Sequence, residues 1–242
     1  MNEKIFYNTH DKKILCGIMN RVNVSKEIVV ICHDEVDSKD SRVCSSVANT
    51  LNNYNFNNFR FDFVSCGESD GDREEYNVTN MINNLNDTLD WLFNEYGYEE
   101  FILFGCGMGA KIISFVNKEK FDIKKLILWY GRLNYSLFNL PSKEEKEAKS
   151  KGFYLDEYGN KYDLDYYLDD RKYITYKNLI NFTIPMLFVH GSEDTVYKYK
   201  HSVKVSKKVK HGTVSLIGGG DHGFKNDRHL KKAIKETVRF LD

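Results

Sequence analysis

The chain of 242 residues lacks features that mark several large classes of protein. No apolar run approaches the ~18 residues of a membrane-spanning helix, and the opening residues 1–5 contain no signal-peptide hydrophobic region. Lysine plus arginine number 35, as do aspartate plus glutamate, so no net charge points to nucleic acid or membrane partners. We therefore expect a cytoplasmic protein that acts on a small-molecule or peptide-like substrate.

The sequence also lacks paired cysteines, internal repeats and linkers. Its five cysteines are an odd number, widely spaced and without a C-x-x-C pair, which is typical of a reducing compartment. Cys66, Cys106 and His222 are too scattered to form a recognisable metal-ligand pattern, so we expect neither metal nor cofactor. The length fits one domain over residues 1–242.

Strand and helix patterns alternate along most of the chain. Continuous apolar runs predict buried strands, and apolar residues at helical spacing predict the helices between them. The expected strands are Glu27–Cys32, Phe59–Val64, the run from Phe101, Ile123–Trp129, Ile184–Gly191 and Thr213–Ile217, after a hairpin of Glu3–Thr9 and Lys13–Asn20. The expected helices are Val43–Tyr54, Val78–Tyr96 and Leu230–Leu241. This alternation predicts an α/β fold with a mostly parallel sheet and helices on both faces.

Residues 131–180 interrupt this alternation. They contain a charged stretch, Lys143–Lys151, followed by a segment rich in tyrosine and aspartate. An excursion of this length indicates a lid, a binding insertion or a flexible segment. We interpret it as a partly helical cap over the carboxyl ends of the strands. Its tyrosines form a candidate recognition surface, with cap packing as the alternative: Tyr154, Tyr158, Tyr162, Tyr166, Tyr167, Tyr173 and Tyr176.

The most informative stretch is residues 101–116, an apolar strand that breaks into glycines and resumes as a helix. Three glycines within five residues permit a sharp turn and close packing. This spacing matches the nucleophile elbow G-x-S-x-G, with Gly105 and Gly109 in the glycine positions. The serine position is then occupied by Gly107. The elbow is present, but its nucleophile is absent.

Four stretches in order carry a resemblance to the α/β-hydrolase superfamily. They are Phe59–Phe63 leading to Gly67–Gly71, the elbow glycines, His190–Val196 and Gly220–Phe224. Within the superfamily the chain looks most like small intracellular cinnamoyl and feruloyl esterases. The resemblance implies an α/β-hydrolase fold, with Asp194 as the triad acid and His222 as the triad histidine. Such an aspartate holds the histidine tautomer and stabilises the imidazolium.

The chain departs from the family pattern where acyl transfer would occur. The family usually has His-Gly and then an oxyanion-hole residue, whereas this chain has His33-Asp34-Glu35, and Ser65-Cys66 replaces the common Gly-His. Two carboxylates facing inward would oppose a developing negative charge. The expected oxyanion-hole region comprises Asp34, Glu35 and Met108. These changes argue that ordinary serine ester hydrolysis is lost or altered.

Three functions remain open from the sequence. In the first, Asp194 and His222 act as a general base on a small acyl or peptide-like substrate, without a serine nucleophile. In the second, the chain is a non-catalytic pseudo-hydrolase that binds a ligand or protein. In the third, it is an esterase or thioesterase that uses Cys106. The last requires an exposed thiolate, whereas a cysteine one residue before the elbow position is expected to point into the packing between sheet and helix.

Overall fold

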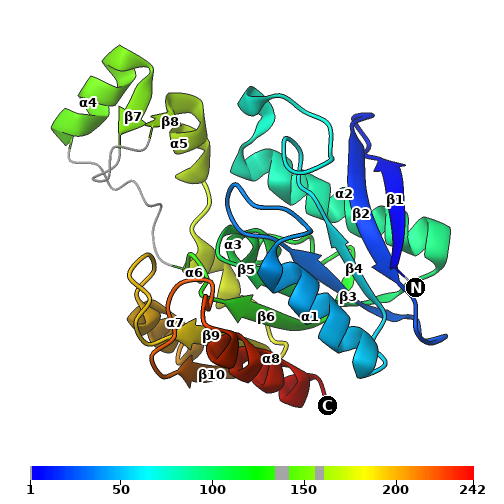
Figure 1. Cartoon of the computed structure of the whole chain (residues 1–242). Helices are drawn as coiled ribbons and strands as arrows, with labels where there is room; N and C mark the ends of the chain where they lie inside the picture. Colours follow the sequence, from blue (N-terminus) through cyan, green and yellow to red (C-terminus); the bar gives the residue numbers. More distant parts are fainter. Residues whose placement is uncertain (1, 134–141, 156–160) are drawn as a thin grey trace.

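The computed structural model describes residues 2–133, 142–155 and 161–242, and its main body is an eight-stranded sheet (Figure 1). The strands lie in the order β1 (Asn2–Asn8), β2 (Ile14–Asn20), β4 (Asn58–Phe61), β3 (Glu27–Cys32), β5 (Glu100–Cys106), β6 (Asp122–Trp129), β9 (Met186–Gly191) and β10 (Gly212–Ile217). The β1–β2 and β2–β4 pairs are antiparallel, and every later pair in this order is parallel. The predicted opening hairpin and mostly parallel sheet are confirmed.

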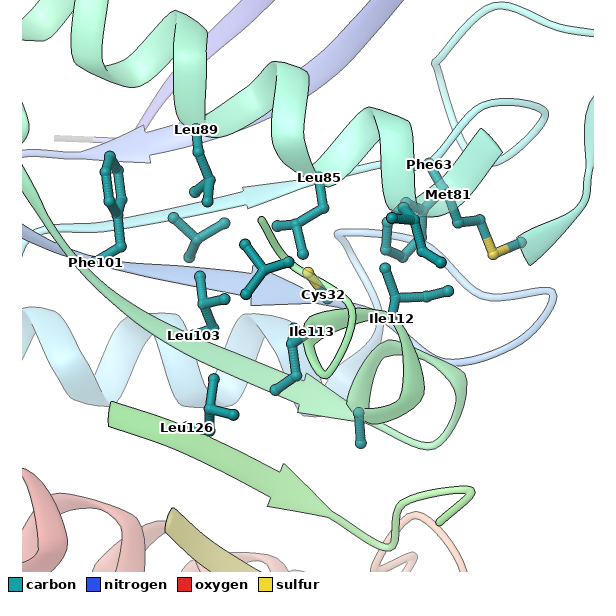
Figure 2. Packing of buried hydrophobic residues seen from close by; sticks show 14 of the residues in the cluster. Cys32, Phe63, Met81, Leu85, Leu89, Phe101, Leu103, Ile112, Ile113 and Leu126 are labelled. Carbon is teal, nitrogen blue, oxygen red and sulfur yellow. The ribbon is translucent and has the colours of Figure 1, made fainter. Parts of the chain in front are cut away.

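Helices cover both faces of the sheet. One face packs against α2 (Val78–Tyr96), α3 (Met108–Ile113) and α7 (Tyr199–Ser206), and the other against α1 (Arg42–Asn53) and α8 (Asp227–Leu241). Figure 2 shows the first layer, in which Leu85 and Leu89 of α2 and Leu103 of β5 belong to one buried apolar cluster. These leucines are fully buried, which contributes about 2 kcal/mol each. The two apolar layers hold the carboxyl ends of the parallel strands together at one edge of the sheet.

The elements differ from the sequence prediction in three places. Strand β4 ends at Phe61 because the next residue, Asp62, turns into a buried ion pair with Lys39, where Lys39 Nζ lies 2.8 Å from Asp62 Oδ2. Helix α3 ends at Ile113, where the Ser114 hydroxyl donates to the Lys111 carbonyl at 2.7 Å. Helix α7 was not predicted, because its eight residues contain few apolar positions.

The segment predicted as a cap contains helices and a small sheet. Its elements are α4 (Ser142–Lys151), β7 (Phe153–Leu155), β8 (Lys161–Asp163), α5 (Leu164–Asp170) and α6 (Thr175–Leu179). Strands β7 and β8 are antiparallel and form a separate two-stranded sheet. In Figure 1 α4, β7, β8 and α5 stand above the carboxyl end of β6, and α6 lies beside that end. Of the tyrosines considered above, Tyr166 and Tyr167 are buried, Tyr173 and Tyr176 are partly buried against the core, and Tyr158 lies outside the described residues.

Across the parts of the chain that the structure describes, no helix has both the length and the apolar character needed to cross a lipid bilayer.

Candidate active site at the elbow

The elbow joins β5 to α3 through Gly107. This residue has φ 51° and ψ −110°, a region that side chains rarely adopt. The backbone segments around the turn approach too closely for any residue but glycine at positions 105 and 109. A Cβ on Gly105 would lie 2.4 Å from the Gly109 carbonyl carbon, and one on Gly109 would lie 2.3 Å from the Cys32 carbonyl oxygen. The turn therefore has the tight geometry predicted from the glycine spacing.

The space above Gly107 is occupied by a carboxylate from another loop. A Cβ on Gly107 would lie 1.8 Å from Asp34 Oδ1, so Asp34 fills the volume that a side chain at the elbow would need. The Met108 N–H donates to Asp34 Oδ1 at 2.7 Å, and the Glu35 N–H donates to the same oxygen at 2.7 Å. In the elbow motif the N–H after the nucleophile receives the oxyanion. Here that donor binds the protein's own carboxylate.

His222 bridges two carboxylates. Its Nδ1 lies 2.9 Å from Asp194 Oδ2 and its Nε2 lies 3.2 Å from Asp34 Oδ2. Burial opposes the charged imidazolium, but the hydrogen bonds to Asp194 and Asp34 outweigh it and raise the pKa of His222 to about 9. Near neutral pH both ring nitrogens therefore carry protons and donate. The resting site holds a protonated His222 between the carboxylates of Asp34 and Asp194.

Asp194 is fixed on every side. Its Oδ1 accepts the backbone N–H groups of Val196 and Tyr197 at 2.8 and 2.9 Å. Its Oδ2, which contacts His222, also lies 3.1 Å from Nε2 of the buried His190. Burial disfavours ionisation, but the hydrogen bonds from His190 and His222 hold the pKa of Asp194 below its usual range. The carboxylate is thus ionised and oriented toward His222.

Two buried tyrosines flank the imidazole. The Tyr130 and Tyr197 rings lie with centroids 4.7 and 5.2 Å from that of His222, both edge-to-face. Tyr130 has φ 34° and its N–H donates to the Val189 carbonyl, which fixes this turn beside the elbow. Neither tyrosine was singled out from the sequence. Their positions just after β6 and β9, at the same sheet edge as the elbow, are the signal that could have identified them.

The loop that carries Asp34 is held at several points. His33 is buried, and its Nδ1 lies 2.7 Å from the Asp34 carbonyl oxygen while its Nε2 accepts the Phe63 N–H at 3.1 Å. Farther along, the Val36 N–H donates to the Tyr76 hydroxyl at 2.9 Å. The hydroxyl of Tyr166, on the cap helix α5, donates to Glu35 Oε1 at 2.5 Å. The loop around Asp34 is therefore held both by contacts within it and by residues from distant segments.

The base of the cap is joined to the elbow helix by buried charges. Lys111 Nζ lies 2.5 Å from Asp170 Oδ1, and Arg132 Nη2 lies 2.9 Å from Asp170 Oδ2. The side chain of Asp170 is fully buried, and those of the two cations are 2% exposed. Burial lowers the pKa of Lys111 to about 8 despite the nearby Asp170 carboxylate. This cluster was not predicted from the sequence, since its three members are far apart in the chain.

Cys106 points away from the site. It is fully buried in the layer facing α1 and α8, and its thiol donates to the Cys32 carbonyl at 3.7 Å. The contact with Cys44, together with burial, raises the pKa of the Cys106 thiol well above its ordinary value. The position offers no exposed thiolate. It agrees with the expectation that Cys106 packs between sheet and helix.

The scattered ligands considered for a metal do not come together. Over the described ranges, three metal-ligating side chains have ligand atoms within 4.8 Å of one another only at His10, Asp11 and Asp87. His10 and Asp11 lie in the β1–β2 turn and Asp87 lies on α2, where its carboxylate already hydrogen-bonds His10. This group therefore does not include the set considered above, Cys66, Cys106 and His222.

Among three comparisons with known proteins, only the one with solved structures found matches. No protein-family model matches the sequence, and no curated protein matches it. Among solved structures, the chain is similar to alpha/beta hydrolase domain-containing protein 10 from mouse, with a TM-score of 0.85, 17% identity and coverage of 99% of this chain and 98% of that one. Est1E from Butyrivibrio proteoclasticus, solved with ferulic acid bound, gives a TM-score of 0.84 at 20% identity, with 98% and 97% covered.

An esterase from Pyrococcus furiosus is also similar, with a TM-score of 0.74, 18% identity and coverage of 100% of this chain and 90% of that one. These similarities extend over nearly the whole chain. Together with the strand order and the elbow, they show that the chain has the α/β-hydrolase fold.

Proposed function

We propose that the chain is a hydrolase-fold enzyme that acts on a small acyl or peptide-like substrate through an acid–base centre of Asp34, His222 and Asp194. The observation that carries this proposal is the position of Asp34. Its carboxylate fills the volume above Gly107 and lies 3.2 Å from His222 Nε2, so a charged group stands where the elbow lacks a nucleophile.

The roles within this centre differ from those expected from the sequence. A histidine that holds its proton up to about pH 9 is an acid near neutrality, so His222 donates a proton to the leaving group. Asp34 Oδ2 takes a proton from water, and that water attacks the substrate. The proton then returns from Asp34 to His222 across the 3.2 Å contact, which restores both groups. Asp194 stabilises the imidazolium and orients its ring.

The test uses variants that keep the size of each side chain. Asp34→Asn and His222→Gln are assayed on a panel of small esters, thioesters and peptides, with α-proton exchange measured in parallel. We expect each variant to lose about 10²-fold or more of the wild-type rate, the usual contribution of a positioned acid or base. Asp37→Asn serves as control, because Asp37 lies in the same loop and its carboxylate accepts the N–H of the neighbouring Ser38 at 2.8 Å. A substrate turned over equally well by Asp34→Asn contradicts the proposal.

A second candidate, a non-catalytic binding protein, is favoured by one specific observation. The Met108 N–H, which would stabilise an oxyanion, already binds Asp34. A site whose oxyanion donor is occupied by Asp34 can bind a ligand without converting it to product. This candidate predicts that panel compounds raise the Tm of the wild-type protein in a saturable way while none is consumed. Turnover that depends on Asp34 removes it.

A further inference from the structure

The loop that carries Asp34 contacts the cap beside the catalytic carboxylate. Glu35 follows Asp34 directly, and its Oε1 accepts the Tyr166 hydroxyl at 2.5 Å. The Tyr166 ring stacks on Tyr76, with centroids 5.7 Å apart and an interplanar angle of 19°. Tyr76 in turn accepts the N–H of Val36, a residue with φ 52°. Two stacked tyrosines therefore contact the two residues that follow Asp34.

Helix α5, which carries Tyr166, is itself fixed to the elbow. Asp170 lies at the end of the same helix and binds Lys111 of α3 and Arg132 after β6. A buried carboxylate with two cationic partners resists displacement, because breaking either contact separates opposite charges in a low-dielectric environment. The Tyr166 hydroxyl therefore has a defined position relative to Gly107.

We infer that Tyr166 is a positioning residue that directs the Asp34 carboxylate into the elbow by binding Glu35. This inference rests on the proposed acid–base centre. A carboxylate that enters the elbow must be directed there by the neighbouring backbone, and the Glu35 N–H donates to the carboxylate itself at 2.7 Å. Tyr166 thus couples the seating of the cap to completion of the catalytic centre. When Tyr166 releases Glu35, Asp34 leaves His222 and the centre is incomplete.

The proton affinity of His222 reports this coupling. The groups that face its ring are Asp194 from the loop after β9, Asp34 from the loop after β3, and the buried Tyr130 and Tyr197. Both tyrosine hydroxyls stay neutral while His222 titrates, because burial raises their pKa values well above the ordinary value. Among these groups, Asp34 is the one that the cap contacts through its loop. Loss of its contact lowers the pKa of His222 while Asp194 stays in place.

The experiment measures the His222 titration by NMR of imidazole-labelled full-length protein. The resonance is assigned from its absence in His222→Gln. We expect Tyr166→Phe to lower the titration midpoint by about one unit, as loss of a nearby opposite charge does. The matched control is Tyr173→Phe, which removes another cap hydroxyl, 2.7 Å from Thr79 Oγ1, without touching the Asp34 loop. Its midpoint is expected to equal that of the wild type.

Two further variants separate the contact with Glu35 from the contact between Tyr166 and Arg132. The Tyr166 hydroxyl also lies 3.5 Å from Arg132 Nη1, a contact that Tyr166→Phe removes as well. Glu35→Ala leaves that contact intact and is expected to lower the His222 midpoint as Tyr166→Phe does. Glu35→Gln retains an oxygen acceptor for the tyrosine, so it is expected to restore most of the wild-type midpoint.

The outcomes distinguish this inference from the proposed function. A wild-type midpoint near the ordinary ~6.5 overturns the Asp34–His222 contact and with it the acid–base centre. A high wild-type midpoint that neither Tyr166→Phe nor Glu35→Ala lowers overturns only the positioning role. A drop of equal size in Tyr173→Phe also overturns it, because the effect then comes from general loosening of the cap.

Discussion

The fit between Gly107 and Asp34 predicts a large, non-additive effect on stability. The perturbation is Gly107→Ala, made in the wild-type chain and again in an Asp34→Ala background. In the wild type the new Cβ would lie 1.8 Å from Asp34 Oδ1, so the carboxylate must leave the elbow. In the Asp34→Ala background that obstacle is absent, and the substitution meets only the backbone conformation of φ 51°.

The expected magnitudes follow from these contacts. A side chain held at this sparsely populated backbone conformation, with φ 51° and ψ −110°, costs about 1–3 kcal/mol. Displacing Asp34 also loses its hydrogen bonds to the Met108 N–H and to His222, which contribute about 1.5–3 kcal/mol each as charged hydrogen bonds and less here because Asp34 is 17% exposed. We expect Gly107→Ala to cost about 4–6 kcal/mol in the wild type and about 1–3 kcal/mol after Asp34→Ala. The interaction energy of the cycle is then about 3 kcal/mol.

Denaturant unfolding of the four proteins measures this cycle. A single domain is stable by about 5–15 kcal/mol, so a coupling of this size is resolved well above the error of the extrapolation. Gly107→Ala with an equal cost in both backgrounds refutes the reasoning, because the carboxylate would then not occupy the elbow. A companion pair, Gly107→Ser alone and with Asp34→Gly, gives a catalytic readout. Of these two variants, we expect the double variant to hydrolyse p-nitrophenyl acetate faster, because its serine meets no carboxylate beside His222.

Three further predictions concern other groups. The raised pKa of His222 stabilises the fold by at most about 3 kcal/mol below about pH 6.5, and this contribution is lost as pH rises through about 9. The free energy of unfolding of the wild type and of His222→Gln, measured across this pH range, checks this prediction. Parallel curves for the two proteins would contradict it. Native Cys106 is expected to resist iodoacetamide until the protein unfolds, as peptide mass spectrometry can show, and rapid labelling would disprove its burial. Lys39→Met is expected to lower the free energy of unfolding by about 3–5 kcal/mol, because it leaves the buried Asp62 without its cation. Lys26→Met, which breaks an exposed pair with Glu99, is expected to cost less than about 1 kcal/mol. Similar losses of stability in the two variants would refute this.

Much of the architecture could be predicted because it depends on local sequence patterns. Strands covered on both faces have continuous apolar runs, as in Glu27–Cys32, and the elbow needs glycine wherever backbones approach closely. Asp194 and His222 were identified through the resemblance to the α/β-hydrolase superfamily, and the structure places their side chains 2.9 Å apart. These features depend on pattern and order, both of which are visible in the chain.

The direction of Asp34 could not be predicted in this way. A loop side chain points where its backbone and neighbours allow, and those neighbours come from distant segments. Met108 is 74 residues from Asp34, and Tyr166 is 131 residues from Glu35. The sequence contained one usable signal, the loss of a side chain at Gly107 together with an added carboxylate at Asp34. The two changes are complementary in volume, which is evident only when they are considered as a pair.

That shared volume also limits how such a site can evolve. A side chain at position 107 and the Asp34 carboxylate in its observed position exclude each other, since the added Cβ would lie 1.8 Å from Asp34 Oδ1. A serine placed at position 107 must therefore push the carboxylate out of the elbow unless position 34 changes as well. Installing a serine nucleophile in this elbow thus requires two substitutions, and the first of them alone disrupts the contact between Asp34 and His222.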